Sequence, residues 1–278
     1  MNTASSPVAA GTYIAPAIPG PAPRWGAAAS QLATGLVLPL LLLGLWQYAV
    51  NQHWLAEQIL PAPALVWQSL VELWENGDLV TNLAISLTRL GWSLAIGGGA
   101  GLLLGLAMGV SPSVKAYLYP GFQLVSQFPV IGWVPLLIIF AGIGEALKIS
   151  AISIAVVVPV AVNTYKGIRN IPRAALEVAA VYRFTFRQKI TRLAIPAASG
   201  SIFNGLRQGV MQAWLSLVFV ELLASSEGIG YLMVWGRQLL QLDIVVVGML
   251  VIGAVGMVLD RLLTWGESRL QGWQLQAY

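Results

Sequence analysis

The chain has 278 residues, of which 57% are hydrophobic and only 9% are charged, and its formal net charge is +4. Because soluble domains carry about 25% charged residues, this composition predicts a polytopic membrane protein. Cysteine is absent, which excludes disulfides and thiolate chemistry, and the single histidine, His53, excludes a metal site built from several histidines.

The N-terminal residues 1–28 are rich in Ala, Pro, Ser and Gly and contain one charge, Arg24. This composition predicts a disordered tail. No basic segment precedes an apolar run at the start, so we do not expect a cleaved signal peptide. The remaining residues, 29–278, are predicted to form one transmembrane domain.

Apolar stretches recur along this domain at about the 20-residue length that a bilayer requires. The six predicted spans are residues 32–50, 83–110, 121–143, 147–165, 197–223 and 244–263. Residues 51–82 hold four acids and neither Lys nor Arg, so we expect them outside, with an interfacial helix after Pro63. The predicted fold class is all-α, a membrane helical bundle of about six transmembrane helices.

The second span carries a face of small residues. Gly97, Gly101, Gly105 and Gly109 recur every four residues, which allows the backbone of another helix to approach closely. That helix belongs either to the same chain or to a second subunit. We favour the same chain, because small faces mostly serve packing within one chain.

The most charged stretch, residues 166–196, carries seven cations and a single acid, Glu177. Such a segment does not lie in hydrocarbon, and positive charge collects in short cytoplasmic loops. The net charge therefore reports topology and does not indicate a nucleic-acid partner. Five apolar residues of this loop recur at helical spacing: Ala175, Val178, Ala179, Tyr182 and Phe186. They predict a short amphipathic helix, which either rests on lipid headgroups or docks into another protein.

Polar side chains inside the predicted spans are candidates for a transport path. Gln127 lies just before Pro129 and Asn163 lies four residues after Pro159, and polar groups near helix-breaking prolines need internal partners or a wet cavity. The fifth span is the most polar, and four of its residues share one face: Asn204, Arg207, Gln208 and Gln212. A polar face on a membrane helix turns inward, toward either a substrate or a neighbouring helix.

Arg207 is the one cation that we place well inside a span. Either it attracts an anion into a pore, or it forms a hydrogen bond between two helices. It lies about 16 Å beyond Pro196 at 1.5 Å per residue, so a side chain reaching the interface would be strained.

The charged loop resembles a known motif. Glu177, Ala179 and Ala180, followed by Leu193-Ala194-Ile195-Pro196, resemble the EAA loop of ATP-binding-cassette (ABC) importer permeases. The glycine of that pattern falls on Arg183, for which a left-handed turn is costlier. From about Leu60 to the sixth span, stretches such as WLSLVFVELLASSEGIGYLM and LQLDIVVV are similar to permeases of the nitrate/sulfonate/taurine group, most of all to aliphatic-sulfonate permeases.

The resemblance implies a type I ABC importer permease fold for residues 29–278, with residues 166–196 as a coupling loop that enters a cleft on a cytoplasmic ATPase. The coupling residues would be Ala175, Glu177, Val178, Ala179, Ala180, Tyr182 and Arg183. Two such subunits would form the pore in the cytoplasmic (inner) membrane, in contact with lipid and with both termini cytoplasmic. ATP and Mg²⁺ would bind to the ATPase subunits, and this chain would hold no cofactor.

The resemblance also implies an external or periplasmic binding protein that delivers the anion. The residues expected to meet it end the fifth span: Glu221, Ser225, Ser226 and Gly228. An ordinary connecting loop explains the same residues.

The function expected from these features is the membrane subunit of an ATP-driven importer for a small anion, an aliphatic sulfonate, with nitrate or taurine as the alternatives. A self-sufficient secondary transporter or channel would need ion-coupling carboxylates in mid-span, and a membrane enzyme would need catalytic residues. The sequence offers neither, and no G-x-x-x-x-G-K-[ST] motif is present, so we expect no enzymatic activity in this chain.

Overall fold

The computed structural model describes residues 25–56 and 59–271, so most of the predicted tail lies outside the described residues. Residues 25–28, which we assigned to the tail, already belong to the first helix, α1 (Trp25–Asn51). The chain divides into two units, of which the first ends at Trp54 and the second begins at Leu55. The described part of the first unit is α1 with the turn that follows, and its side chains from Val37 onward are mostly apolar and exposed, as expected of a helix in lipid.

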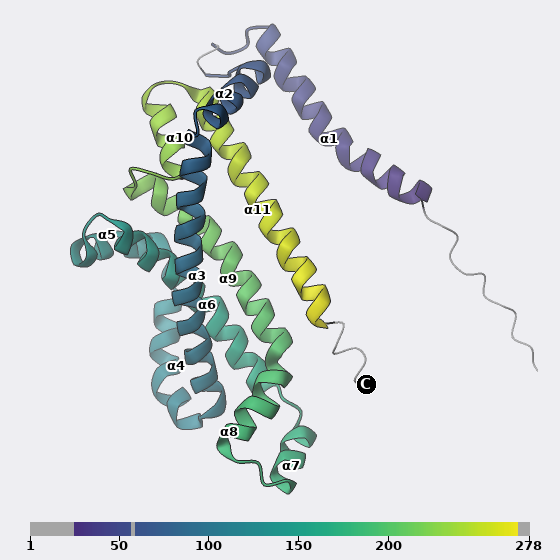
Figure 1. Cartoon of the computed structure of the whole chain (residues 1–278), viewed down its shortest axis with the longest axis vertical. Helices are drawn as coiled ribbons and strands as arrows, with labels where there is room; N and C mark the ends of the chain where they lie inside the picture. The colour runs from purple at the N-terminus through teal and green to yellow at the C-terminus, as the bar shows by residue number, and fades with distance from the viewer. Residues whose placement is uncertain (1–24, 57–58, 272–278) are drawn as a thin grey trace, which may run out of the picture. The chain divides into compact units, whose positions relative to one another are not determined.

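The second unit is entirely helical within the described residues (Figure 1). Its elements are α2 (Pro63–Glu75), α3 (Asp78–Val110), α4 (Pro112–Ser126), α5 (Val130–Ala141), α6 (Glu145–Arg169), α7 (Arg173–Val181), α8 (Phe186–Gln188), the π-helix η1 (Lys189–Ala194), α9 (Ile195–Ala224), α10 (Ile229–Gln238) and α11 (Leu242–Gln271). Among the described residues three helices, α3, α6 and α11, are long and apolar enough to cross a membrane, and two bent pairs raise the number to as many as five. The chain is therefore an all-α membrane protein.

The predicted glycine face of α3 packs against α6. A Cβ atom added to Gly97 would lie 2.5 Å from the carbonyl oxygen of Ser153, and one added to Gly105 would lie 2.7 Å from that of Ala161. Real side chains cannot come this close, so glycine is what lets the two backbones approach. The expectation that the partner helix belongs to the same chain is confirmed.

The opposite side of α6 packs against α9 in the same manner. Gly205 abuts the backbone at Pro159, and Gly209 abuts Val160, whose other side meets Gly101 of α3. The helix α6 is thus held between α3 and α9, and its side chains fill the main core. α11 joins this core through Trp214, which is buried and whose Nε1 donates a hydrogen bond to the carbonyl oxygen of Ile252 at 3.2 Å.

The third predicted span, residues 121–143, is not one continuous helix. Residues 121–143 contain the junction of α4 and α5, which meet at an angle of 100°, and Figure 1 shows α5 lying across the direction of α6. The cause is Pro129, which has an extended backbone (ψ 140°) and lacks the N–H that would continue the helix. This bend shapes the site described below.

The other five predicted spans lie within α1, α3, α6, α9 and α11, each of which extends beyond the predicted bounds on at least one side. The predicted interfacial helix is α2, which exposes Leu65 and Trp74 and buries Val66 and Leu73.

Candidate functional site

A cavity of about 790 Å³ lies between the end of α4, the bend before α5, and the helices α6 and α9. Its wall contains every polar residue that we predicted for a transport path: Gln127, Asn163, Asn204, Arg207, Gln208 and Gln212. Phe128, Met211 and Leu215 add apolar surface. The bend at Pro129 is what places the end of α4 beside α6 and α9, so three separate segments of the chain contribute to one wall.

The amides of this cavity connect α6 to α9. Nδ2 of Asn163 donates to the carbonyl oxygen of Pro159 at 2.8 Å and to Oε1 of Gln208 at 3.1 Å. Oδ1 of Asn163 accepts a hydrogen bond from Nδ2 of Asn204 at 3.4 Å. The repeat of four residues on α9 keeps these amides on one face, where they present neutral donors and acceptors to the cavity.

Arg207 lines the same cavity and is held from its other side by α11. Its Nη1 lies 2.8 Å from Oε2 of Glu267, and its Nη2 lies 2.8 Å from Oδ1 of Asp260. The side chain of Arg207 is 31% exposed, and its guanidinium uses two of its five N–H groups in these bonds. Arg207 therefore links α9 to α11 and also faces the cavity, while its attraction of an anion stays a prediction.

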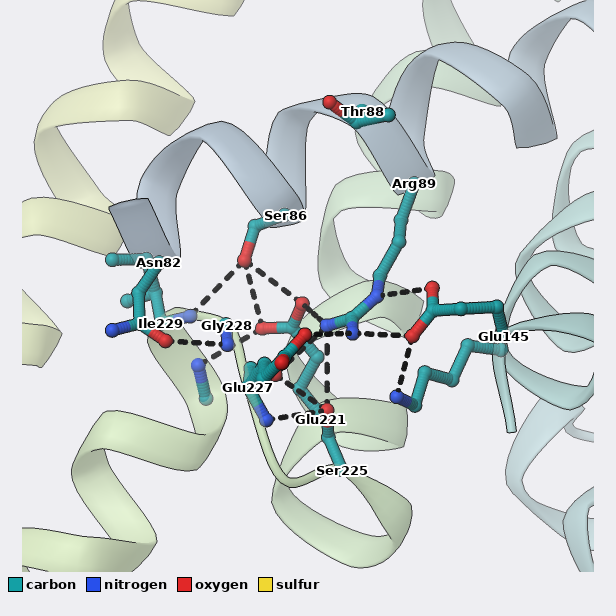
Figure 2. Close-up of polar contacts among 12 residues, drawn as sticks. Asn82, Ser86, Thr88, Arg89, Glu145, Glu221, Ser225, Glu227, Gly228 and Ile229 are labelled. Atoms are coloured by element: carbon teal, nitrogen blue, oxygen red, sulfur yellow. Dashed lines mark hydrogen bonds and ion pairs between the residues drawn. The ribbon is translucent and has the colours of Figure 1, made fainter. Parts of the chain in front are cut away.

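A second polar cluster joins the far ends of α3, α6 and α9 (Figure 2). Nε and Nη2 of Arg89 donate to the two carboxylate oxygens of Glu145 at 2.8 and 2.6 Å, and Nη1 donates to Oε1 of Glu221 at 2.8 Å. Lys148 adds a further bond to Glu145 at 2.8 Å. Arg89 is only 2% exposed, so our assignment of Arg207 as the one cation well inside a span was wrong.

Glu221 proves to be part of this cluster. It is 1% exposed and accepts hydrogen bonds from Oγ of Ser86 and from the backbone N–H of Gly230. Gly228 is also buried, and its N–H donates to Oδ1 of Asn82 at 2.7 Å. The expectation that Glu221 and Gly228 contact an external protein is therefore corrected, because both of these residues are buried.

Arg89 also fixes the loop between α9 and α10. Its Nη1 donates to the carbonyl oxygen of Glu227 at 2.8 Å and lies 3.3 Å from Oγ of Ser225, as Figure 2 shows. Ser225 is partly buried, while Ser226 and Glu227 remain exposed. The exposed tip of this loop is thus held in place by the hydrogen bonds that Arg89 donates to it.

Sequence patterns did not identify Glu145, Asp260 and Glu267 as the partners of these arginines. One signal was present: each of the two arginines inside an apolar span requires a compensating acid, and acids are few in this chain. Among the described residues, no group of three or more His, Cys, Asp or Glu side chains is arranged to hold a metal ion.

Comparison with known proteins decides what this architecture is. Residues 97–272 match the family model described as the binding-protein-dependent transport system inner membrane component. The chain belongs to this family. It is an ABC importer permease subunit, and the matched residues include the α4–α5 bend, the cavity and the charged loop.

Three relatives of this permease are named for sulfonates or taurine. It is 33% identical over 240 residues to the putative aliphatic sulfonates transport permease protein SsuC of Bacillus subtilis. The aligned residues make up 86% of this chain and 87% of the relative. The identity to SsuC of Escherichia coli is 34% over 80% of this chain and 85% of the relative. The identity to the taurine transport system permease protein TauC of E. coli is 30%, over 84% of this chain and 86% of the relative.

Solved structures show the same fold. The crystal structure of an amino acid ABC transporter with histidines superposes on this permease with a TM-score of 0.62 at 16% identity. The superposition covers 72% of this chain and 97% of the chain in the solved structure. The type I ABC importer permease fold that we predicted is confirmed.

The charged loop of this permease folds as α7, α8 and η1. α7 ends in a left-handed turn at Arg183, whose φ is +50°. The N–H of Phe184 bonds to the carbonyl oxygen of Ala179, and that of Arg183 bonds to Ala180, both at 3.0 Å, which is the Schellman arrangement. The turn that the family pattern makes with glycine is therefore kept with arginine, at a cost of about 1–2 kcal/mol.

The seven residues expected to couple to an ATPase do not all face outward. Ala179 is 3% exposed, and Ala175 is partly buried and packs against the cluster that contains Ile168 and Ile171. The exposed members are Glu177, Val178, Ala180, Tyr182 and Arg183. Phe186, at the start of α8, is exposed as well, so an apolar surface remains open on this loop.

Proposed function

We propose that this permease carries a small organic anion, an aliphatic sulfonate, through the cavity at the α4–α5 bend. The observation that supports this most is the convergence of six polar residues from three segments on one cavity wall. The relatives named for aliphatic sulfonates and taurine support the same substrate class.

The chemistry of the wall suits such a substrate. Asn163, Asn204, Gln208 and Gln212 offer neutral N–H donors that replace part of the water around sulfonate oxygens without holding the ion as tightly as free cations would. Phe128 and Met211 offer apolar surface for an alkyl group. Nitrate has no apolar part, so this mixed lining favours a sulfonate over nitrate.

Transport in this proposal depends on partners. A cytoplasmic ATPase, which binds ATP and Mg²⁺, docks on the exposed apolar surface of Val178, Tyr182 and Phe186. A second copy of the chain closes the open side of the cavity. An external binding protein meets the tip of the α9–α10 loop at Ser225 and Ser226. The charged loop then lies in the cytoplasm, as do both termini.

The test is uptake by the transporter reconstituted in liposomes with its ATPase and its binding protein. We expect uptake of ethanesulfonate to require ATP on the side of the membrane that holds the ATPase. We also expect it to exceed uptake of taurine and of nitrate at equal concentration. Uptake that continues without ATP would identify a channel or a secondary transporter. ATP-dependent uptake of nitrate in preference to both sulfonates would show that the substrate is an inorganic anion and not a sulfonate.

A further inference from the structure

A second pocket, of about 330 Å³, lies beneath the charged loop and apart from the transport cavity. It is formed where α3 and α6 end, and α7 and η1 close it. Its apolar floor consists of Val110, Ile168, Ile171, Ile190, Leu193 and Ala194. Two cations, Arg169 and Lys189, stand at its wall.

The two cations have no acidic partner within the described residues. Both side chains are exposed, and the only acid of the loop, Glu177, does not line the pocket. Lys189 opens the π-helix η1, in which the N–H of Ile195 bonds to the carbonyl oxygen of Ile190, five residues earlier. A π-helix is rare and often marks a functional site, and here Lys189, Ile190 and Leu193 from it all line the pocket.

The position of the pocket identifies its environment. The apolar helices α3 and α6 end at Val110 and Arg169, where the charged loop begins, so the pocket lies at the boundary between hydrocarbon and water. The pocket is lined by Leu176 and Ala179 of α7. The residues that we assign to the ATPase contact, Val178, Tyr182 and Phe186, do not line it and are all more than half exposed.

Two cations above an apolar floor at this boundary match an amphiphilic anion. We propose that the pocket binds an anionic phospholipid of the cytoplasmic leaflet, with the headgroup phosphate at Arg169 and Lys189 and the first acyl carbons against the floor. Basic pockets at the cytoplasmic ends of transmembrane helices bind such headgroups in membrane proteins. A bound lipid would fill the space between the membrane helices and α7, and so support the loop that the ATPase contacts.

The test compares two charge-matched variants of the full chain in nanodiscs that contain equal amounts of phosphatidylglycerol and phosphatidylcholine. Arg169→Gln/Lys189→Gln removes the two pocket cations. Arg173→Gln/Arg187→Gln removes two cations from the same loop that do not line the pocket. After transfer to mild detergent, mass spectrometry counts the phosphatidylglycerol that remains bound to each protein.

We expect the wild type and the control variant to retain phosphatidylglycerol, and the pocket variant to retain about tenfold less. Equal losses in both variants would show only general surface attraction, and no loss in either would remove the site. Displacement of the lipid by inorganic phosphate, without acyl chains, would show that the floor takes no part. If Arg169→Gln/Lys189→Gln keeps its lipid but loses a co-purifying ATPase, the cations serve that protein and the proposal fails.

Discussion

Nη1 of Arg89 donates a hydrogen bond of 2.8 Å to Oε1 of Glu221, across 132 residues of sequence, and both side chains are buried. The bond ties α3 to the end of α9, and the bidentate contact with Glu145 ties α3 to α6. Three helices that line or support the cavity are thereby fastened at one end, while Arg207 fastens α9 to α11 nearer the other end.

The first prediction concerns this fastening. Arg89→Leu leaves two carboxylates, Glu145 and Glu221, without their shared cation, and breaking a buried ion pair from one side costs about 3–5 kcal/mol. We expect a lower thermal unfolding temperature and poor recovery of the protein in detergent. The control is Arg237→Leu, which removes an exposed arginine of α10. A loss of stability no greater than that of the control would show that the cluster does not hold the helices together.

The second prediction concerns the close contact of α3 with α6. A Cβ atom on Gly105 would lie 2.6 Å from Cβ of Thr164, so Gly105→Ala forces the helices apart and should destabilise the protein by about 1–3 kcal/mol. Gly99 has no atom within 4 Å of such a Cβ, so Gly99→Ala should be neutral or stabilising by up to about 1 kcal/mol, because alanine favours the helix. Thermal unfolding of the two variants in one detergent is the measurement. The same response from both would mean that the helices do not meet at this face.

The third prediction concerns the turn after α7. Arg183 has a φ of +50°, which glycine adopts freely, so Arg183→Gly relieves strain of about 1–2 kcal/mol. Greater freedom in the unfolded chain offsets part of this gain, by about 0.4–1 kcal/mol. We therefore expect a small rise in the unfolding temperature. Glu177→Gly, in the middle of α7, should lower it by the ordinary helix cost of glycine. If Arg183→Gly lowers it too, the turn is not left-handed in the protein.

The fourth prediction separates the two roles of Arg207. Asp260→Asn removes one competing carboxylate but keeps a hydrogen-bond acceptor, so an anion in the cavity meets a less compensated guanidinium. The KM for sulfonate uptake should fall by about threefold or more, with the maximal rate retained. Arg207→Gln should instead lower uptake per assembled transporter by about tenfold or more, since two carboxylates are left without a cation beside the anion's path.

A purely structural Arg207 gives a different pattern in the same assays. Asp260→Asn would then lower thermal stability and leave the KM unchanged. The two outcomes are distinguishable, because the first lowers the KM for sulfonate uptake and the second lowers the unfolding temperature.

Local patterns were enough to predict much of this fold. The four-residue repeat that begins at Gly97 identified a packing face. The spacing of Asn204 and Gln208 placed both on one inward face of their helix, which is the cavity wall. Both features depend only on helical geometry, so the sequence alone was enough to predict them. The bend was missed although Pro129 was noted: a proline in a membrane helix is compatible with a kink or with a complete break, and neighbouring helices decide between them.

The ion pairs were beyond local patterns. Arg89 and Glu221 lie on different helices far apart in sequence, and no spacing rule connects them. Charge balance required an acid near Arg89 but did not select one. Glu221 therefore looked like a loop residue available to a partner, when it is the buried end of a helix.

The proposed path of the anion is the cavity at the α4–α5 bend. The chain has no cysteine, so one introduced at Gln212, on the cavity wall, reports on that site alone. In the assembled transporter in detergent, we expect 2-sulfonatoethyl methanethiosulfonate, which itself carries an aliphatic sulfonate, to label Gln212→Cys. We also expect ethanesulfonate to slow this labelling and to leave the labelling of Gln68→Cys on α2 unchanged. If no sulfonate slows the labelling of Gln212→Cys, under conditions in which uptake is saturated, the cavity is not the path of the anion.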